Sequence, residues 1–188
     1  MPLVDPDPQI VIEDALHAWV VAGSGLAAHH VIWAAEATGG GPAPGGTYIE
    51  MRLIAVDRDS SDWLVSTRTS SGDVLLHVQG TRRPTLELTC IAGERYGSLR
   101  ASQILDRVLT AVQQPTVAAI LHAGGVGVGT RGKINVVPGV RSAMFDPRAV
   151  VEVGLHTMID ISEPGSAIES VTADMPGAVT SSVSKPSP

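Results

Sequence analysis

Cysteine and aromatic residues are scarce in this sequence, and both shortages limit what it can do. Cys90 is the only cysteine among 188 residues, so neither an intramolecular disulfide nor a cluster of thiolate metal ligands can form. Such cysteine usage is typical of a reducing compartment, and we expect the cytoplasm. Aromatic residues make up only 3% of the chain, so the core must consist mainly of Val, Ile, Leu and Ala.

Basic residues and long apolar runs are also scarce. With 13 Lys and Arg residues against 19 Asp and Glu residues, the formal net charge is -6. Tight binding to nucleic acid is not expected, because it depends on cations that neutralise phosphates. No stretch approaches the ~18 apolar residues that a membrane-spanning helix requires, so we expect no membrane partner. Hydrophobic residues nevertheless make up 44% of the chain, which predicts a folded, soluble protein.

Two glycine patterns match the motif G-x-G-x-x-G/A of dinucleotide-binding turns. The first, at residues 23–28, follows a segment with helical periodicity, and too few residues separate it from the next apolar run for a crossover helix. We interpret it as a helix end and keep a small dinucleotide-binding enzyme as the distant alternative. The second, at residues 127–132, runs into a strand signal and not into a helix N-terminus, and is interpreted as a loop or hairpin.

Metal ligands and catalytic groups are not spaced as their chemistry requires. The histidines form no H-E-x-x-H pattern, and the adjacent His29 and His30 are expected to point apart on a strand. Asp57, Asp59 and Asp62 resemble the start of a calcium loop, but the glycine and the closing glutamate are missing. The cysteine alternates with leucines and is expected in the core, and no serine lies in a G-x-S-x-G motif. We therefore predict no enzymatic activity, no cofactor and no metal site.

Apolar periodicity and turn residues predict an α+β fold. Helical periodicity is present at residues 8–22, 98–114 and 115–122. Alternation or short apolar runs predict strands at residues 31–34, 49–55, 63–69, 74–80, 86–92, 133–137 and 151–161. The turn sequence at residues 70–73 predicts a hairpin between two of these strands. Since strands lie on both sides of the helical pair without regular βαβ alternation, we expect a mostly antiparallel sheet packed against two or three helices.

Glycine and proline concentrate in two segments that we expect to be extended loops. Their candidate contact residues are Gly39, Gly41, Pro42 and Pro44 in the first, and Gly125, Gly127, Gly129, Arg131 and Lys133 in the second. Ring-forming subunits use such loops to reach their neighbours, although monomers carry flexible loops as well. After Ser162 the composition turns to Ser, Thr, Pro, Gly and Ala, so we predict one domain over residues 1–162 and an extended low-complexity arm over residues 163–188.

Several segments, taken in order along the chain, carry a resemblance to a known family. They are the N-terminal amphipathic helix ending near Gly23, then His30-Val31-Ile32-Trp33-Ala34, Tyr48-Ile49-Glu50-Met51-Arg52-Leu53, Gly80 to Leu88, Gln114-Pro115-Thr116-Val117 and Phe145-Asp146-Pro147-Arg148-Ala149. Across them, over about residues 9–162, the chain resembles the neck terminator-like proteins of long-tailed bacteriophages. The shared patterns concern packing and turns, and no catalytic residues carry over.

The resemblance implies a tail-terminator-like fold and a structural virion protein of the neck, assembled in the host cytoplasm. Its implied partners are further copies of the chain in a ring, a homohexamer, together with the tail tube protein, the head connector or adaptor protein, and the tail sheath. The ring would cap the tail tube, end its polymerisation and let genomic DNA pass through a negative or neutral lumen without specific binding. The two glycine-rich loops would contact tube or connector, and the arm would contact a neighbouring subunit. The alternative is a tail-tube or baseplate subunit.

Overall fold

The chain folds into a mixed sheet and α-helices, which confirms the predicted α+β class. A computed structural model describes residues 8–34, 45–58, 61–69, 73–93, 98–141 and 144–165. Within these ranges the helices are α1 (Pro8–Ser24), the 3-10 turn η1 (Ala28–His30), α3 (Ser98–Ala111) and α4 (Pro115–Ala123). The strands are β1 (Val31–Trp33), β2 (Tyr48–Arg58), β3 (Trp63–Arg68), β4 (Val74–Ile91), β5 (Val126–Arg131), β6 (Asn135–Arg141) and β7 (Met144–Gly165).

Most strand pairs in the sheet are antiparallel, as predicted. The strand order is β1-β2-β4-β7-β5, with β3 paired to β4 and β6 paired to β7. β1 and β2 are parallel, whereas β2 with β4, β3 with β4, β5 with β7 and β6 with β7 are antiparallel. The predicted hairpin is present as β3 and the start of β4, with Trp63 opposite Gln79 and Arg68 opposite Val74.

Strand β4 corrects the prediction of two separate strands at residues 74–80 and 86–92. Gly80 and Pro84 lie between the two alternating patterns, and both are buried within one continuous strand. The pairing partner changes along β4 and the strand itself does not end: β3 pairs with residues 74–79, and β2 pairs with residues 82–91. Alternation alone cannot reveal a change of partner, because the period of two continues through it.

Strand β5 corrects the prediction of a loop at residues 127–132. Gly127 and Gly129 were interpreted as loop residues, yet both lie in a strand that pairs with β7. A Cβ atom on Gly129 would lie 2.5 Å from the Nε2 atom of His156, so a larger residue here would require the His156 side chain to move. β7 is also longer than the predicted strand at residues 151–161.

By its contacts the chain divides into two units. The larger unit comprises residues 1–61 and 80–159, and the smaller unit comprises residues 62–79 and 160–188. β4 and β7 each have residues in both units, whereas α1, α3 and α4 all belong to the larger unit. The domain boundary that we place at residue 162 stays a prediction.

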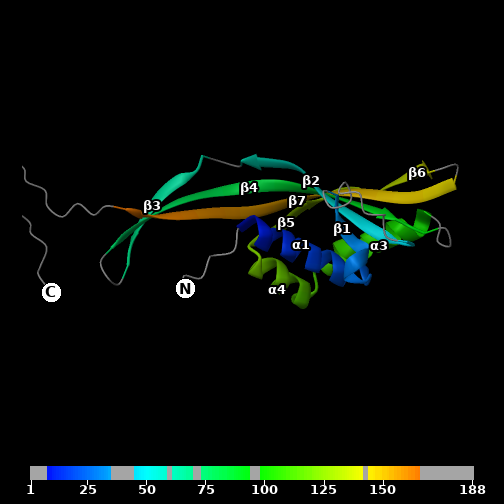
Figure 1. Ribbon diagram of the computed structural model, residues 1–188, viewed down its shortest axis with the longest axis horizontal. Coiled ribbons are helices and arrows are strands. Elements are labelled where there is room, and N and C mark those ends of the chain that lie inside the picture. Colours follow the sequence, from blue (N-terminus) through cyan, green and yellow to red (C-terminus); the bar gives the residue numbers. More distant parts are fainter. Residues whose placement is uncertain are drawn as a thin grey trace, which may run out of the picture. The chain divides into compact units, whose positions relative to one another are not determined.

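The core of the larger unit lies between one face of its sheet and the three helices (Figure 1). Trp19 of α1 is completely buried, and its indole Nε1–H donates a hydrogen bond of 3.0 Å to the carbonyl oxygen of Val108 in α3. Gly23 allows these two helices to approach closely, because a Cβ atom there would lie 2.8 Å from the Cα atom of Val108. Cys90 is buried on the same face as Leu88, as predicted.

Candidate interaction surfaces

The predicted contact residues fall in different parts of the chain. Outside the described residues lie Gly39, Gly41, Pro42 and Pro44. The second set follows α4 along the chain and comprises Gly125, Gly127, Gly129, Arg131 and Lys133. Gly125 has a φ of 66° just after α4, the next three lie in β5, and Lys133 is exposed between β5 and β6. The structure thus places the second set on and beside one strand, and its role in contacts stays a prediction.

The strands β5 and β6 leave one side of their backbones without a strand partner. Each pairs with β7 and with no other strand in the described part of the chain. Val136 and Val137 of β6 are 48% and 40% exposed, which is high for branched aliphatic side chains. An open strand edge with apolar side chains is a surface on which another strand can add.

A second open edge lies on β2. β1 covers β2 only from Ile49 to Met51, so among the described strands nothing pairs with the outer side of residues 52–58. Ile54 and Val56 in this part of β2 are 40% and 59% exposed. The larger unit therefore has apolar side chains at open edges formed by two different strands.

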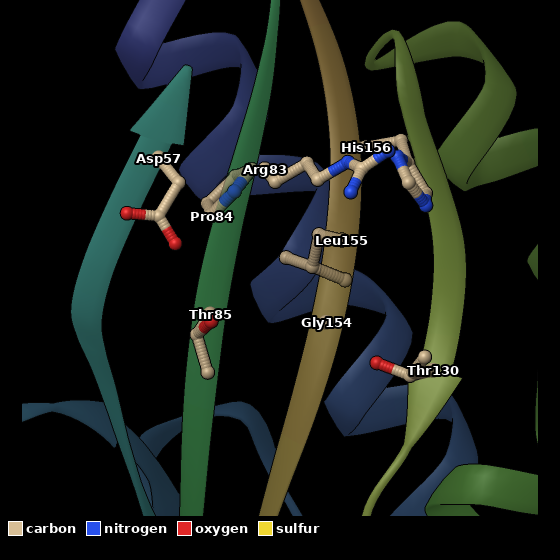
Figure 2. A pocket seen from close by; sticks show the side chains of 8 residues that line it. All are labelled: Asp57, Arg83, Pro84, Thr85, Thr130, Gly154, Leu155 and His156. Carbon is tan, nitrogen blue, oxygen red and sulfur yellow. The ribbon is translucent and has the colours of Figure 1, made fainter. Parts of the chain in front are cut away.

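The face of this sheet that is turned away from α1 contains a hollow of about 380 Å³ (Figure 2). Its lining residues come from β2, β4, β5 and β7: Asp57, Arg83, Pro84, Thr85, Thr130, Gly154, Leu155 and His156. Gly154 lines the hollow without a side chain of its own, and a Cβ atom there would collide with the hydroxyl of Thr130. Figure 2 shows the Arg83 side chain extending across β7 toward His156. An open hollow with both signs of charge suits a polar side chain of a partner protein better than a buried apolar ligand.

In the smaller unit, a chain of polar side chains joins three strands. The carboxylate of Asp160 on β7 accepts hydrogen bonds from Gln79 Nε2 at 2.8 Å and from His77 Nδ1 at 3.1 Å, both on β4. On β3, the Thr67 hydroxyl lies 2.8 Å from His77 Nε2, and the Trp63 indole donates to Gln79 Oε1 at 3.2 Å. The hydrogen bond from Gln79 lowers the pKa of Asp160, desolvation opposes this, and the hydrogen bond and charge of His77 lower the pKa further. We call these five residues the cross-strand clasp.

Three members of the cross-strand clasp have the order of a hydrolytic triad, hydroxyl to imidazole to carboxylate. Acyl transfer also needs N–H donors aimed at the developing oxyanion. Thr67 lies within the β3–β4 ladder. Backbone N–H groups in a ladder lie in the plane of the sheet, whereas the Thr67 hydroxyl projects from that plane, so they are not aimed at a carbonyl group beside it. We therefore interpret the clasp as an attachment between strands. Sequence reasoning missed it because His77 and Asp160 are 83 residues apart.

Three of the other histidines lie in α1 and η1. His17 Nε2 lies 2.9 Å from the carbonyl oxygen of Val31. The prediction that His29 and His30 point apart on a strand is wrong: both lie in η1, where the tight turn brings their ring centroids to 4.3 Å. Among the residues that the structure describes, no three His, Cys, Asp or Glu side chains are grouped to hold a metal ion. Nor does that part of the chain contain a helix long and apolar enough to cross a membrane.

The glycine pattern at residues 23–28 is the end of α1, as predicted. Gly25 has a φ of 70°, and its N–H donates to the carbonyl oxygen of Val21 at 3.1 Å. The Ser24 hydroxyl accepts the N–H of Leu26 at 3.2 Å, which closes the turn. A dinucleotide-binding turn needs a strand before its glycines, and here a helix precedes them.

Fold and surfaces together define an α+β protein whose distinctive features are open strand edges and exposed apolar side chains, with no assembled catalytic group among the described residues. The sequence model of the phage neck terminator proteins matches residues 11–182, and the chain belongs to this family. It is thus a structural protein of the bacteriophage neck. No curated protein sequence matches the chain significantly. The match extends past the region, residues 9–162, in which the sequence resemblance was expected.

Proposed function

We propose that this chain is the subunit of a ring that caps the tail tube and joins it to the head connector. The observation that carries the proposal is the family match over residues 11–182, which covers nearly all of the chain. The protein then acts by self-assembly and docking, without catalysis. Copies of itself, the tail tube protein and the connector are its partners, with the sheath as a further contact. Assembly takes place in the host cytoplasm, and DNA passes through the lumen.

Exposed apolar side chains support a role in protein contacts. Within the described ranges, nine exposed large hydrophobic residues lie on strands: Ile54, Val56, Trp63, Leu64, Val78, Val136, Val137, Met158 and Ile161. Side chains of this kind on sheet faces and edges are stabilised when a partner protein excludes water from them. A chain that stayed a monomer would leave all of them in solvent.

The C-terminal arm is part of this proposal. Its first residues, 163–165, complete β7, and the rest lies outside the described residues. Because the family match continues to residue 182, we propose that the arm contacts a neighbouring subunit in the ring. The two glycine-rich segments are proposed contacts with the tube and the connector.

Electron microscopy and mass measurement of the purified full-length protein test the proposal. We expect closed rings of one diameter and one subunit number, with six subunits as the proposed number. Open tubes would instead support a tail-tube subunit, and a monomer at all concentrations would contradict ring formation. A chain that ends at Gly165 should fold with the same circular dichroism spectrum but give fewer rings, whereas an unchanged ring yield would exclude a role for the arm.

The same proposal can be tested in phage. A nonsense mutation early in the gene should yield heads and tails that fail to join, with tails of irregular length, because nothing caps the tube. Supplying the wild-type protein from a plasmid should restore joined particles and uniform tails. Normal particles without the protein would contradict the neck role.

A further inference from the structure

We propose that neighbouring subunits join edge to edge, with the open edge of β2 on one copy pairing with the open edge of β6 on the next. The partner is a second copy of this chain. The inference rests on the proposed ring and names the surfaces that form it.

Ring closure requires two unlike surfaces on each subunit. In a head-to-tail interface one patch of a subunit contacts a different patch of its neighbour, so both patches must be exposed together on one chain. The larger unit meets this requirement, because β2 from Arg52 to Arg58 and β6 each have one side without a strand partner in the described part of the chain. Unpaired backbone N–H and C=O groups along such edges are satisfied when a strand from another molecule is added.

The exposed side chains of the two edges also match. Val56 lies opposite the buried Pro84, and Val136 lies opposite the buried Ala149. Since opposite residues of antiparallel strands share a face, both valines lie on the face of the sheet that packs against the helices. Pairing β2 with β6 would place Val56 beside Val136 and continue the apolar core row across the subunit boundary. In the single chain both residues remain exposed, Val56 at 59% and Val136 at 48%.

Charge near the two edges favours the same pairing. Arg52 on β2 forms an ion pair of 3.1 Å with Glu87, so its charge is already compensated. Asp57 on β2 and Lys133 before β6 are exposed, and neither has an ion pair within the residues described. The carboxylate of Asp57 and the ammonium of Lys133 have opposite charges, so these two side chains would attract each other if the two edges met.

Two substitutions test the inference, each made in the full-length chain. Val56→Asp places a carboxylate on the β2 edge, and Val136→Asp does the same on the β6 edge. We expect each variant to be monomeric where the wild type forms rings, with association weakened about 30-fold or more, as for a central interface residue. Ile10→Asp is the matched control: Ile10 is 54% exposed on α1, so this variant should keep forming rings.

Mixing the two edge variants distinguishes unlike from like edge contacts. The Val56→Asp variant keeps an intact β6 edge, and the Val136→Asp variant keeps an intact β2 edge. An equal mixture should therefore form a dimer with one copy of each, measured by native mass spectrometry with a mass tag on one variant. Rings from either variant alone, or a mixture that stays monomeric while both variants have the wild-type circular dichroism spectrum, would overturn the edge assignment.

Hydrogen exchange gives a test that needs no variant. On going from dissociated subunits to wild-type rings, amides in residues 52–58 and 135–141 should exchange at least about 10-fold more slowly, because edge amides gain hydrogen bonds. Wild-type rings without this protection would reject the edge pairing and leave the proposed function intact. Absence of wild-type rings would reject the proposed function itself, so the two failures are separable.

Discussion

Single side chains in this protein use their polar groups for attachment and not for reaction. The Trp19 indole is tied to the backbone of α3, and His17 lies within hydrogen-bond distance of the Val31 carbonyl. Burial raises the pKa of the Cys90 thiol to about 12, so it is not a thiolate nucleophile near neutral pH. The cross-strand clasp joins five polar side chains in this way, with the exposed carboxylate of Asp160 at its centre.

The cross-strand clasp should make the smaller unit sensitive to acid. Because the pKa of Asp160 is lowered in the folded state, its ionised form stabilises the fold above the ordinary aspartate pKa of about 3.9. This contribution is lost as the pH falls through the lowered pKa. We expect Asp160→Asn, which cannot ionise, to remove that part of the pH dependence. Hydrogen exchange of residues 63–68 and 74–79 between pH 7 and about pH 3 measures it.

The control for this substitution is Asp106→Asn, which changes an exposed carboxylate on α3 in the larger unit. It should leave the acid response of β3 and β4 as in the wild type. Equal acid sensitivity in the wild type and in Asp160→Asn would show that the clasp does not depend on the charge of Asp160. The effect is expected to be small, since an exposed carboxylate is well solvated.

Among the secondary-structure elements, the packing of α1 depends on small residues at its crossings. Gly23 meets Val108 and Ala111 of α3, and Gly124, just after α4, meets Ala15 of α1. At both places a Cβ atom on the glycine would come too close to its neighbour, so the helices are nearer than larger residues would permit. The position of α1 on the sheet therefore follows from the absence of side chains as much as from the burial of Trp19.

Gly23→Ala tests this close crossing. Alanine favours a helix over glycine by up to ~1 kcal/mol, but its methyl group would lie 2.8 Å from a backbone atom of α3, which cannot rotate away. We expect a net loss of about 1–2 kcal/mol in the free energy of unfolding from overpacking, measured by urea denaturation. Gly45→Ala is the control: nothing lies within 4 Å of a Cβ atom there, so its stability should change by less than about 0.5 kcal/mol. Equal stability of both variants would mean that α1 and α3 can separate freely.

For the molecule as a whole, net charge determines how it should behave toward DNA. A formal charge of -6 gives no general attraction to phosphate, which is consistent with the proposed ring and its passage of DNA. We expect no saturable binding of double-stranded DNA in 150 mM salt at protein concentrations up to about 100 µM, measured by fluorescence anisotropy. Tight, salt-dependent binding would reveal a concentrated basic surface and count against passage without specific contacts.

The features of this fold that could be predicted from sequence are those that depend on the backbone preferences of neighbouring residues. Proline at position 115 and glycine at positions 25 and 125 marked helix ends because their backbone preferences act over one or two residues, and the structure has those ends. Alternation around Leu86 and Leu88 identified a half-buried strand for the same reason. The family resemblance added the neck role, and the match to the family confirms it.

The pairing of segments far apart in the sequence could not be predicted from these local preferences. Gly127 and Gly129 have the preferences of a loop, yet both lie in a strand, because β7, far along the chain, supplies its pairing partner, with Gly127 opposite His156. Asp160 meets His77 only because β7 lies beside β4, and no periodicity encodes that neighbour. The chain order therefore specifies the class, the helix ends and the lack of spaced catalytic motifs. Tertiary contacts decide the rest: the glycines that pack closely, the strand edges that stay open and the polar groups that meet. Each of these features requires two segments with unrelated sequences to come together.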